Sequence, residues 1–254
     1  MARAAQIPCQ NGFMKIYLAI ALVLGVAATT LMSDDRPAQF VPPISDPADP
    51  SYVVVPDVPG LPRVLFIGDS ISMGYMLPVR AMLKGRANVH RPADNCGQTA
   101  YGLMHLDEWL GSGHWDVIHF NFGLHDLKYV DAKGTYVTPD KGRRIATPTM
   151  YGKNLEELIA RLRGTGARLI FATTTPVPTG AEGRVVGSER VYNAVALRVM
   201  KENGIAVDDL WSYAAPRQAR IQKKNDVHFT PQGYRELAGL VSKSILAALP
   251  PQPR

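Results

Sequence analysis

Short apolar runs alternate with amphipathic segments from residue 63 to residue 249, and this alternation constrains the fold more than any other feature of the chain. Strands that alternate with helices predict a parallel sheet of about five strands with helices on both faces. The apolar runs lie at 63–67, 87–91, 116–122, 168–173 and 205–210, and the helical segments at 71–85, 99–110, 154–163, 189–202 and 231–249. We therefore expect one α/β domain over residues 63–249.

A polar, charged stretch over residues 130–150 interrupts this alternation after the third predicted strand. Parallel sheets bind ligands outside the carboxyl ends of their strands. A long insertion beside such an end is typical of a loop that faces the substrate. The residues that directly follow each strand are accordingly the first candidates for a functional site.

The first 62 residues lack this alternation. Residues 16–28 form a run of 13 apolar residues after Lys15, and small residues follow. This pattern predicts a secretory signal, and therefore an exported protein. The run is short for a membrane span, although an uncleaved anchor that extends to Met32 remains an alternative. Residues 1–32 are thus predicted to be a signal peptide or N-terminal anchor, a possible membrane tether. Residues 33–62 hold eight prolines and are predicted to be an extended linker.

Composition excludes several functional classes. Hydrophobic residues make up 46% of the chain, as in globular proteins. The formal charge of +6 is mild, its clusters lie in polar stretches, and no nucleic-acid-binding motif accompanies them, so we expect no nucleic-acid partner. No P-loop, dinucleotide turn or metal-type Cys/His spacing occurs, so no cofactor or metal is expected. Cys96 is predicted to be a small buried residue.

Four polar clusters each lie where a strand or loop gives way to a helix. They are Gly68-Asp69-Ser70, residues 94–98, residues 121–126 and residues 225–231. Taken alone, Ser70 could equally be a helix cap, and a lone histidine such as His228 is more often structural than catalytic. The order and context of the four clusters favour a catalytic interpretation.

In these clusters the chain resembles the SGNH (GDSL-type) hydrolase superfamily over residues 63–249. The resemblance implies a flavodoxin-like three-layer α/β/α fold, with Ser70 as the nucleophile and His228 as its general base. It also implies an oxyanion hole built from the N–H groups of Ser70 and Gly97. The family's third motif, Gly-x-Asn-Asp, appears here as residues 123–126 with His125 in place of the asparagine, so His125 is expected to be the third oxyanion donor.

The acid that would orient His228 departs from the family's Asp-x-x-His spacing. Asn225 stands three residues before His228, and Asp226 stands two residues before it. Asp226 could still reach the imidazole, Asn225 could orient the ring as a neutral acceptor, or a backbone carbonyl could do so. We favour Asp226. Asp126 is a fallback that we expect to hold loops near the site.

These assignments predict acyl transfer to Ser70 followed by hydrolysis of the acyl-enzyme. Serine is a poor nucleophile without an adjacent base, and histidine can take its proton near neutral pH. We expect an exported serine esterase that acts on short acyl esters or carbohydrate acetyl esters. A non-catalytic carbohydrate- or cell-wall-binding protein with the same fold and a membrane-anchored lipase or phospholipase are the alternatives.

Overall fold

The computed structural model describes residue 1 and residues 41–250 of the chain. Apart from residue 1, the signal peptide or anchor expected over residues 1–32 lies outside the described residues. Within the described part of the chain, no helix combines the length and the apolar character needed to cross a membrane.

A five-stranded parallel sheet forms the centre of the domain, as the alternation of apolar runs predicted. Its strand order is β2-β1-β3-β6-β7, and every pair of neighbours is parallel. The three central strands are almost entirely buried, which explains why they occur in the sequence as continuous apolar runs. In chain order their bounds are β1 Arg63–Ile67, β2 Asn88–His90, β3 Val117–Phe120, β6 Arg168–Ala172 and β7 Ala206–Asp208.

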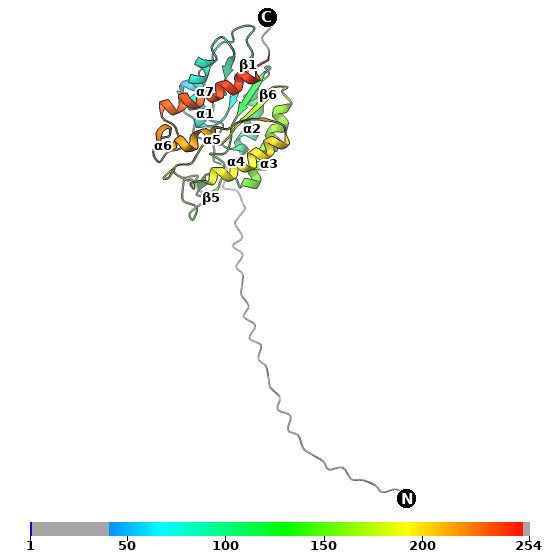
Figure 1. Cartoon of the computed structure of the whole chain (residues 1–254), viewed down its shortest axis with the longest axis vertical. Helices are drawn as coiled ribbons and strands as arrows, with labels where there is room; N and C mark the ends of the chain where they lie inside the picture. The colour runs from blue at the N-terminus through cyan, green and yellow to red at the C-terminus, as the bar shows by residue number, and fades with distance from the viewer. Residues whose placement is uncertain (2–40, 251–254) are drawn as a thin grey trace. The chain divides into compact units, whose positions relative to one another are not determined.

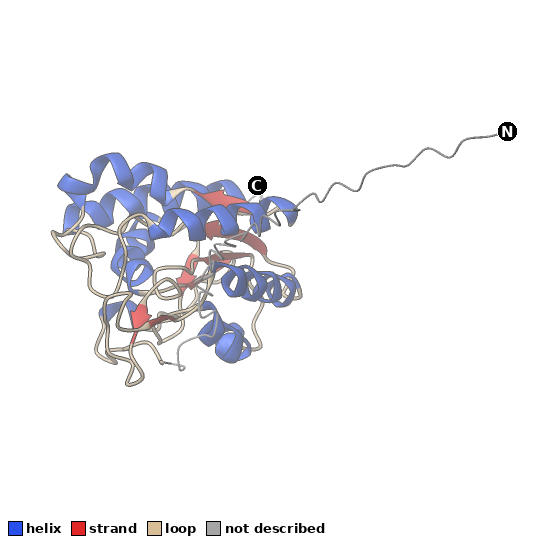
Figure 2. Ribbon diagram, turned by 90° about the horizontal axis from the view of Figure 1, so that it is seen from below, coloured by secondary structure: helices blue, strands red, loops and turns tan. Residues whose placement is uncertain are grey.

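Helices cover both faces of this sheet and complete the expected three-layer α/β/α fold (Figures 1 and 2). On one face, α1 (Ser70–Met82) packs against α7 (Pro231–Ala248). On the other face, α3 (Pro148–Arg163) packs between α2 (Thr99–Leu110) and α4 (Ser188–Glu202). Because β1 and β3 are parallel neighbours, their carboxyl ends lie at the same edge of the sheet. The polar clusters that contain Ser70 and His125 begin at this edge.

Several elements differ from the sequence prediction in their bounds. Helix α3 begins at Pro148 rather than residue 154, because Thr147 caps it by accepting a hydrogen bond from the Met150 N–H at 3.2 Å. The insertion forms a short antiparallel hairpin of β4 (Tyr129–Val130) and β5 (Arg143–Arg144). Three short helices join β7 to α7: α5 (Leu210–Ala214), the 3-10 helix η2 (Ala215–Arg217) and α6 (Gln218–Ile221).

Residues 41–62, part of the predicted proline-rich linker, lie against the domain and are called the docked segment below. The Gln98 side chain donates to the Val41 carbonyl at 2.9 Å, and the Ser45 hydroxyl donates to Asp94 at 2.8 Å. A 3-10 helix, η1 (Pro50–Tyr52), buries the Tyr52 side chain. Proline-rich composition carried no information about these side-chain anchors.

Candidate active site

Ser70 begins α1 directly after the turn that ends β1. The cap of this helix is Asp69, whose carboxylate accepts a hydrogen bond from the Ile71 N–H at 3.0 Å. The Ser70 hydroxyl is therefore not needed as a cap. The turn also requires the glycine at position 68, because a Cβ there would lie 2.9 Å from the Ser72 hydroxyl oxygen. The N–H of Ser70 lies in the first helical turn, where backbone N–H groups lack intrahelical partners.

His228 reaches Ser70 from the opposite end of the sequence. The distance between Ser70 Oγ and His228 Nε2 is 2.8 Å, within the reach that proton transfer requires. A closed loop positions the ring: the Lys223 N–H donates to the His228 carbonyl at 2.9 Å, and Gln222 Nε2 donates to the Val227 carbonyl at 2.8 Å. Thr230 then caps α7, which begins at Pro231.

Asp226 holds the other nitrogen of the His228 ring. Its Oδ1 lies 2.6 Å from His228 Nδ1 and accepts the backbone N–H of the same histidine at 3.1 Å. A carboxylate can only accept, so Nδ1 carries the proton and Nε2 is left to accept from the Ser70 hydroxyl. Partial burial alone would raise the pKa of Asp226, but the hydrogen bonds from His228 outweigh burial and lower it.

Asn225 does not contact the imidazole. It occupies the left-handed region with φ +58°, and its side chain packs against Gly180. This backbone turn brings Asp226 round to His228 across two residues instead of three. Of the three arrangements considered for the acid, the geometry therefore matches the one with Asp226.

His125 is buried and lies among cationic groups. Its Nδ1 is 3.3 Å from Lys128 Nζ. Burial, reinforced by the charges of Lys128, Arg184 and His228, lowers the pKa of His125 well below its usual value. The ring is consequently neutral near pH 7 and has one N–H to donate.

Gly97 adopts φ +54° and is covered by the docked segment, because a Cβ at this position would lie 2.9 Å from Cγ of Pro43. Its N–H points to the Asn95 side-chain oxygen at 3.3 Å. The Gly97 N–H, an expected oxyanion donor, is therefore engaged in a long hydrogen bond within its own turn. An incoming oxyanion would compete with Asn95 for the Gly97 N–H.

Asp126 binds the start of α2 instead of the imidazole. It accepts hydrogen bonds from the Thr99 hydroxyl at 2.6 Å and from the Thr99 N–H at 3.1 Å. Burial raises the pKa of Asp126 to about 7, although both Thr99 bonds act in the opposite direction. The expectation that Asp126 holds loops near the site agrees with these contacts.

Comparison with known proteins identifies the family. The model of the GDSL-like lipase/acylhydrolase family matches residues 66–236. The chain belongs to this family. The resemblance that the four motifs indicated is therefore confirmed, and with it the assignment to an enzyme class that hydrolyses esters. No curated protein matches the chain in sequence.

Solved structures share the fold of this chain at low identity. A lipase/acylhydrolase from Enterococcus faecalis is 20% identical, with a TM-score of 0.62, over 76% of this chain and 100% of that one. An acetyl xylan esterase is 14% identical, with a TM-score of 0.58, over 72% and 99%. An acetylxylan esterase from Geobacillus stearothermophilus is 14% identical, with a TM-score of 0.57, over 74% and 93%. At these identities the likeness supports the fold alone.

Two cavities flank the Ser70–His228 pair of this GDSL-like protein. The first cavity, of about 380 Å³, is lined by polar and cationic side chains that include His125, Lys128 and Arg184. The second cavity, of about 390 Å³, is mostly apolar and includes Met73 and Leu77. The docked segment contributes Ile44 to the first cavity and residues 49–51 to the second. The two sides of the reacting groups thus differ in chemistry.

The motif clusters did not include several residues that line the first cavity. Lys128 follows the third motif by two residues, and Tyr136 and Arg184 come from loops without any recognisable motif. Ile44 lies in the docked segment, far from Ser70 in the sequence. A polar, charged insertion beside a strand end was the one signal available, and it correctly indicated a loop near the site.

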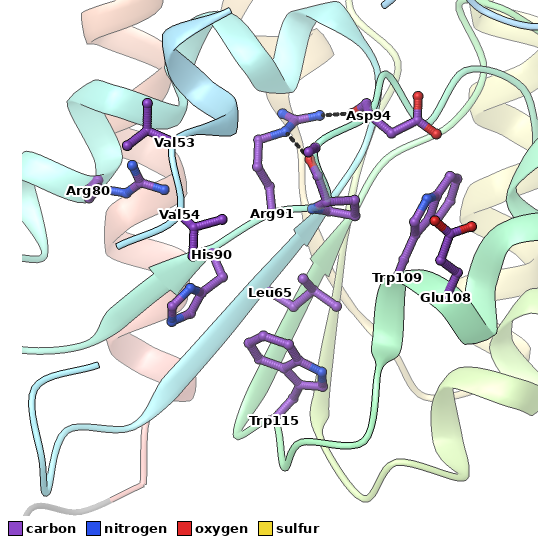
Figure 3. A pocket seen from close by; sticks show the side chains of 12 residues that line it. Val53, Val54, Leu65, Arg80, His90, Arg91, Asp94, Glu108, Trp109 and Trp115 are labelled. Carbon is purple, nitrogen blue, oxygen red and sulfur yellow. Dashed lines mark hydrogen bonds between the residues drawn. The ribbon is translucent and has the colours of Figure 1, made fainter. Parts of the chain in front are cut away.

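A third cavity, of about 290 Å³, lies apart from the Ser70–His228 pair and borders the edge strand β2 (Figure 3). Trp109 and Trp115 line it, but both side chains are nearly buried. These tryptophans therefore pack in the core rather than present an open face for a sugar. Within residues 41–250, no group of three His, Cys, Asp or Glu side chains is placed to hold a metal ion.

Proposed function

We propose that this member of the GDSL-like family is an exported serine esterase with Ser70 as nucleophile, His228 as general base and Asp226 as the group that orients the base. The observation that carries the proposal is the continuous contact from Ser70 Oγ to His228 Nε2 at 2.8 Å and from His228 Nδ1 to Asp226 at 2.6 Å. This arrangement of nucleophile, base and orienting group activates a serine hydroxyl for attack on an ester.

The proposed reaction has two halves. Ser70 Oγ attacks the ester carbonyl carbon while His228 Nε2 takes the hydroxyl proton. The resulting tetrahedral intermediate collapses, the alcohol leaves with the proton from His228, and an acyl-serine remains. Water then attacks the acyl group with His228 again as base, which releases the acid and restores Ser70.

The developing negative charge needs donors that are already in place. We assign this role to the Ser70 N–H, the neutral His125 ring and the Gly97 N–H. The burial of His125 beside Lys128 supports its assignment as an oxyanion donor. In a site of low dielectric, a nearby positive charge also stabilises an oxyanion. Gly97 joins the hole by exchanging its 3.3 Å bond with Asn95 for one with the oxyanion.

The substrate class that we favour is a short acyl ester, with carbohydrate acetyl esters first. The polar first cavity beside Ser70 suits a hydrated alcohol group such as a sugar. Two of the solved structures with this fold carry the names acetyl xylan esterase and acetylxylan esterase, which supports the same substrate class.

An apolar groove supports a second candidate, a lipase that acts on longer acyl chains. The groove has a volume of about 630 Å³ and is lined by Met82, Ala81 and Pro231. It shares Gly74, Pro78 and Tyr234 with the second cavity. An acyl chain bound in the second cavity could therefore continue along the surface between α1 and α7.

Hydrolysis of 4-nitrophenyl esters tests both candidates. We expect the wild-type protein to hydrolyse 4-nitrophenyl acetate and the Ser70→Ala variant to be inactive. A fall in kcat/KM from acetate to octanoate supports the short-acyl proposal, and a rise supports the lipase. Release of acetate from acetylated xylan, compared with a neutral triglyceride, tests the natural substrate class. Wild-type activity equal to that of Ser70→Ala would refute the esterase.

Export is tested separately by expressing the full chain in a bacterial host. We expect the mature protein outside the cytoplasm, with its N-terminus between residues 28 and 34. Recovery of the intact residue 1 with the membrane fraction would favour the anchor instead.

A further inference from the structure

We propose that the first cavity binds a carboxylate carried by the ester substrate, and that Lys128 and Arg184 hold this carboxylate. The inference rests on the proposed esterase function, because it concerns the substrate bound beside Ser70. It narrows the substrate class from esters in general to esters that bear a negative charge near the scissile bond.

Lys128 is buried, with 3% of its surface exposed, yet among the described residues its ammonium group has only neutral hydrogen-bond partners. It donates to the Tyr136 hydroxyl at 2.7 Å and lies 3.3 Å from His125 Nδ1. The ammonium also lies 4.5 Å from the centre of the Tyr136 ring. A buried cation normally has an anionic partner, because desolvation is costly. Without one, burial and the charge of Arg184 lower the pKa of Lys128 to about 7, and a bound anion would favour its charged ammonium form. Lys128 lines the first cavity, so a ligand there can supply that partner.

Arg184 provides a second cation in the lining of the same cavity. Its Nε donates to the Leu124 carbonyl at 3.0 Å, and its Nη1 donates to the Glu182 carbonyl at 3.2 Å. These two bonds fix the guanidinium plane. In the described part of the chain, Nη2 has no hydrogen-bond partner and remains able to donate to a ligand.

The acidic groups nearby do not neutralise both cations. The Asp226 carboxylate is engaged with His228, and Glu182 is exposed to solvent. Asp69 is the buried carboxyl that interacts electrostatically with Lys128 and Arg184. It caps α1 through the Ile71 N–H, and burial raises its pKa. The cavity lining holds two carboxylates, Glu182 and Asp226, but among the described residues neither forms an ion pair with Lys128 or Arg184.

The donors that remain suit a carboxylate better than a phosphate. After hydrogen bonds to Tyr136 and His125, the Lys128 ammonium has one hydrogen left to donate. Arg184 can donate the two hydrogens of Nη2. A group with one negative charge and two oxygens can use these donors fully. A phosphate dianion would keep oxygens without partners in a buried site.

The test compares esters that differ only in charge. One pair is 4-acetoxybenzoate and methyl 4-acetoxybenzoate, with the charge on the alcohol side. The other is 4-nitrophenyl hydrogen succinate and its methyl ester, with the charge on the acyl side. We expect the wild-type kcat/KM to favour the anionic member of at least one pair about tenfold, as hydrogen bonds to a charged group allow. Equal rates within both pairs would overturn the proposal.

Two variants test whether Lys128 and Arg184 cause the preference for anionic esters. Lys128→Met keeps the approximate length of the side chain and removes its charge. Arg184→Gln changes a side chain that is less buried than Lys128, so this variant is expected to disturb folding less. Each should reduce the anionic-to-neutral ratio about tenfold. Lys133→Met is the matched control, because it removes one positive charge at an exposed position five residues after Lys128. A ratio that both cavity variants leave unchanged would overturn the assignment to Lys128 and Arg184.

Binding to the Ser70→Ala variant, measured by calorimetry, separates this inference from the esterase proposal. We expect the anionic member of at least one of the two pairs to bind about tenfold more tightly than its methyl ester, whether or not turnover occurs. Equal affinities within both pairs refute the carboxylate site even in an active esterase. Tighter binding of 4-acetoxyphenyl phosphate than of 4-acetoxybenzoate would also refute the carboxylate in favour of a phosphate.

Discussion

The two halves of the candidate site depart from the family pattern to different degrees. The half that activates the nucleophile joins Ser70, His228 and Asp226 in direct contact although the acid is displaced by one position. The half assigned to the oxyanion replaces an asparagine with His125 and directs the Gly97 N–H toward Asn95. In the first half, the sequence spacing between acid and histidine differs from the family pattern, but the contacts of the triad are present. In the second half, the hydrogen-bond donors themselves differ from the family pattern.

This contrast follows from what each half must accomplish. A base and its orienting acid need one short contact each, so a left-handed turn at Asn225 is enough to restore the geometry. An oxyanion hole needs several donors aimed at one point, so exchanging one donor alters the field at that point. We therefore expect substitutions in the first half to abolish activity and substitutions in the second half to modulate it.

The largest effect is expected from Asp226→Asn. The amide can donate to His228 Nδ1, which stabilises the tautomer that cannot accept the Ser70 proton, and kcat should fall about 10³–10⁴-fold, as in other triads. Steady-state kinetics with 4-nitrophenyl acetate measure this loss. A fall below tenfold would demote Asp226.

Asn225→Gly provides the matched comparison for Asp226→Asn. Glycine tolerates φ +58°, so the turn is preserved while the amide is lost. We expect kcat within about threefold of wild type, since Asn225 makes no contact with the imidazole. A loss as large as that of Asp226→Asn would return the orienting role to Asn225.

His125→Ala should have the next largest effect. Loss of one oxyanion donor typically lowers kcat by about 10²–10³-fold. His125→Asn, which restores the amide of the family motif, should recover most of this loss. KM should change less than kcat for both variants, since the donor acts on the transition state. Unchanged kinetics in His125→Ala would remove the ring from the oxyanion hole.

The pH profile gives an independent test of the same ring. A histidine donor adds a pH dependence to catalysis over the range in which its ring titrates. Because the pKa of His125 is lowered well below 6.5, the ring stays neutral across the neutral range, and its protonation is confined to acid solution. The kcat profiles of the wild type and His125→Asn should therefore run parallel near pH 7 and diverge only at low pH.

The elements of the fold were predictable because their signals are local. The central strands β1, β3 and β6 are mostly buried apolar runs, and α7 carries its own start signal in Thr230 and Pro231. The Ser70–His228 contact was predictable from motif order. The geometry of Asp226 was not, because it depends on the backbone conformation of Asn225, which sequence spacing does not specify.

Long-range contacts limited the prediction elsewhere. The docked segment is held by single hydrogen bonds to residues about 50 positions away, such as Ser45 to Asp94, and no periodic pattern records such anchors. Lys128 and Arg184 are ordinary cations in the sequence. Their place in one cavity depends on how two loops fold over the sheet edge.

Asp126, the neighbour of His125, gives a test of smaller expected effect, on the pH dependence of stability. Its pKa is about 7 in the folded chain against 3.8 without perturbation, so between these pH values the unfolded state binds fewer protons. The unfolding free energy of the wild type should therefore decrease as pH rises from 4 to 7, by up to about 1.4 kcal/mol per pH unit. Asp126→Asn should lack this slope, as measured by urea unfolding at each pH. Parallel curves would mean that Asp126 is ionised in the fold.

Ser45→Ala should have the smallest effect, and it tests whether the docked segment belongs to the site. The variant loses the hydrogen bond to Asp94 and the acceptor for the Asn95 N–H, which weakens docking by about 1 kcal/mol. Ile44 lines the first cavity beside Ser45, so KM should rise a few-fold while kcat stays near the wild-type value.

Limited proteolysis should show faster cleavage within residues 41–49 of the Ser45→Ala variant, because a loosened segment is more accessible to a protease. Ser188→Ala, which removes a hydroxyl that bonds only to the nearby Val185 carbonyl, is the control. A lower kcat with unchanged KM would instead place the docked segment in the positioning of Gly97, which Pro43 covers, and would move its influence from substrate binding to the oxyanion half.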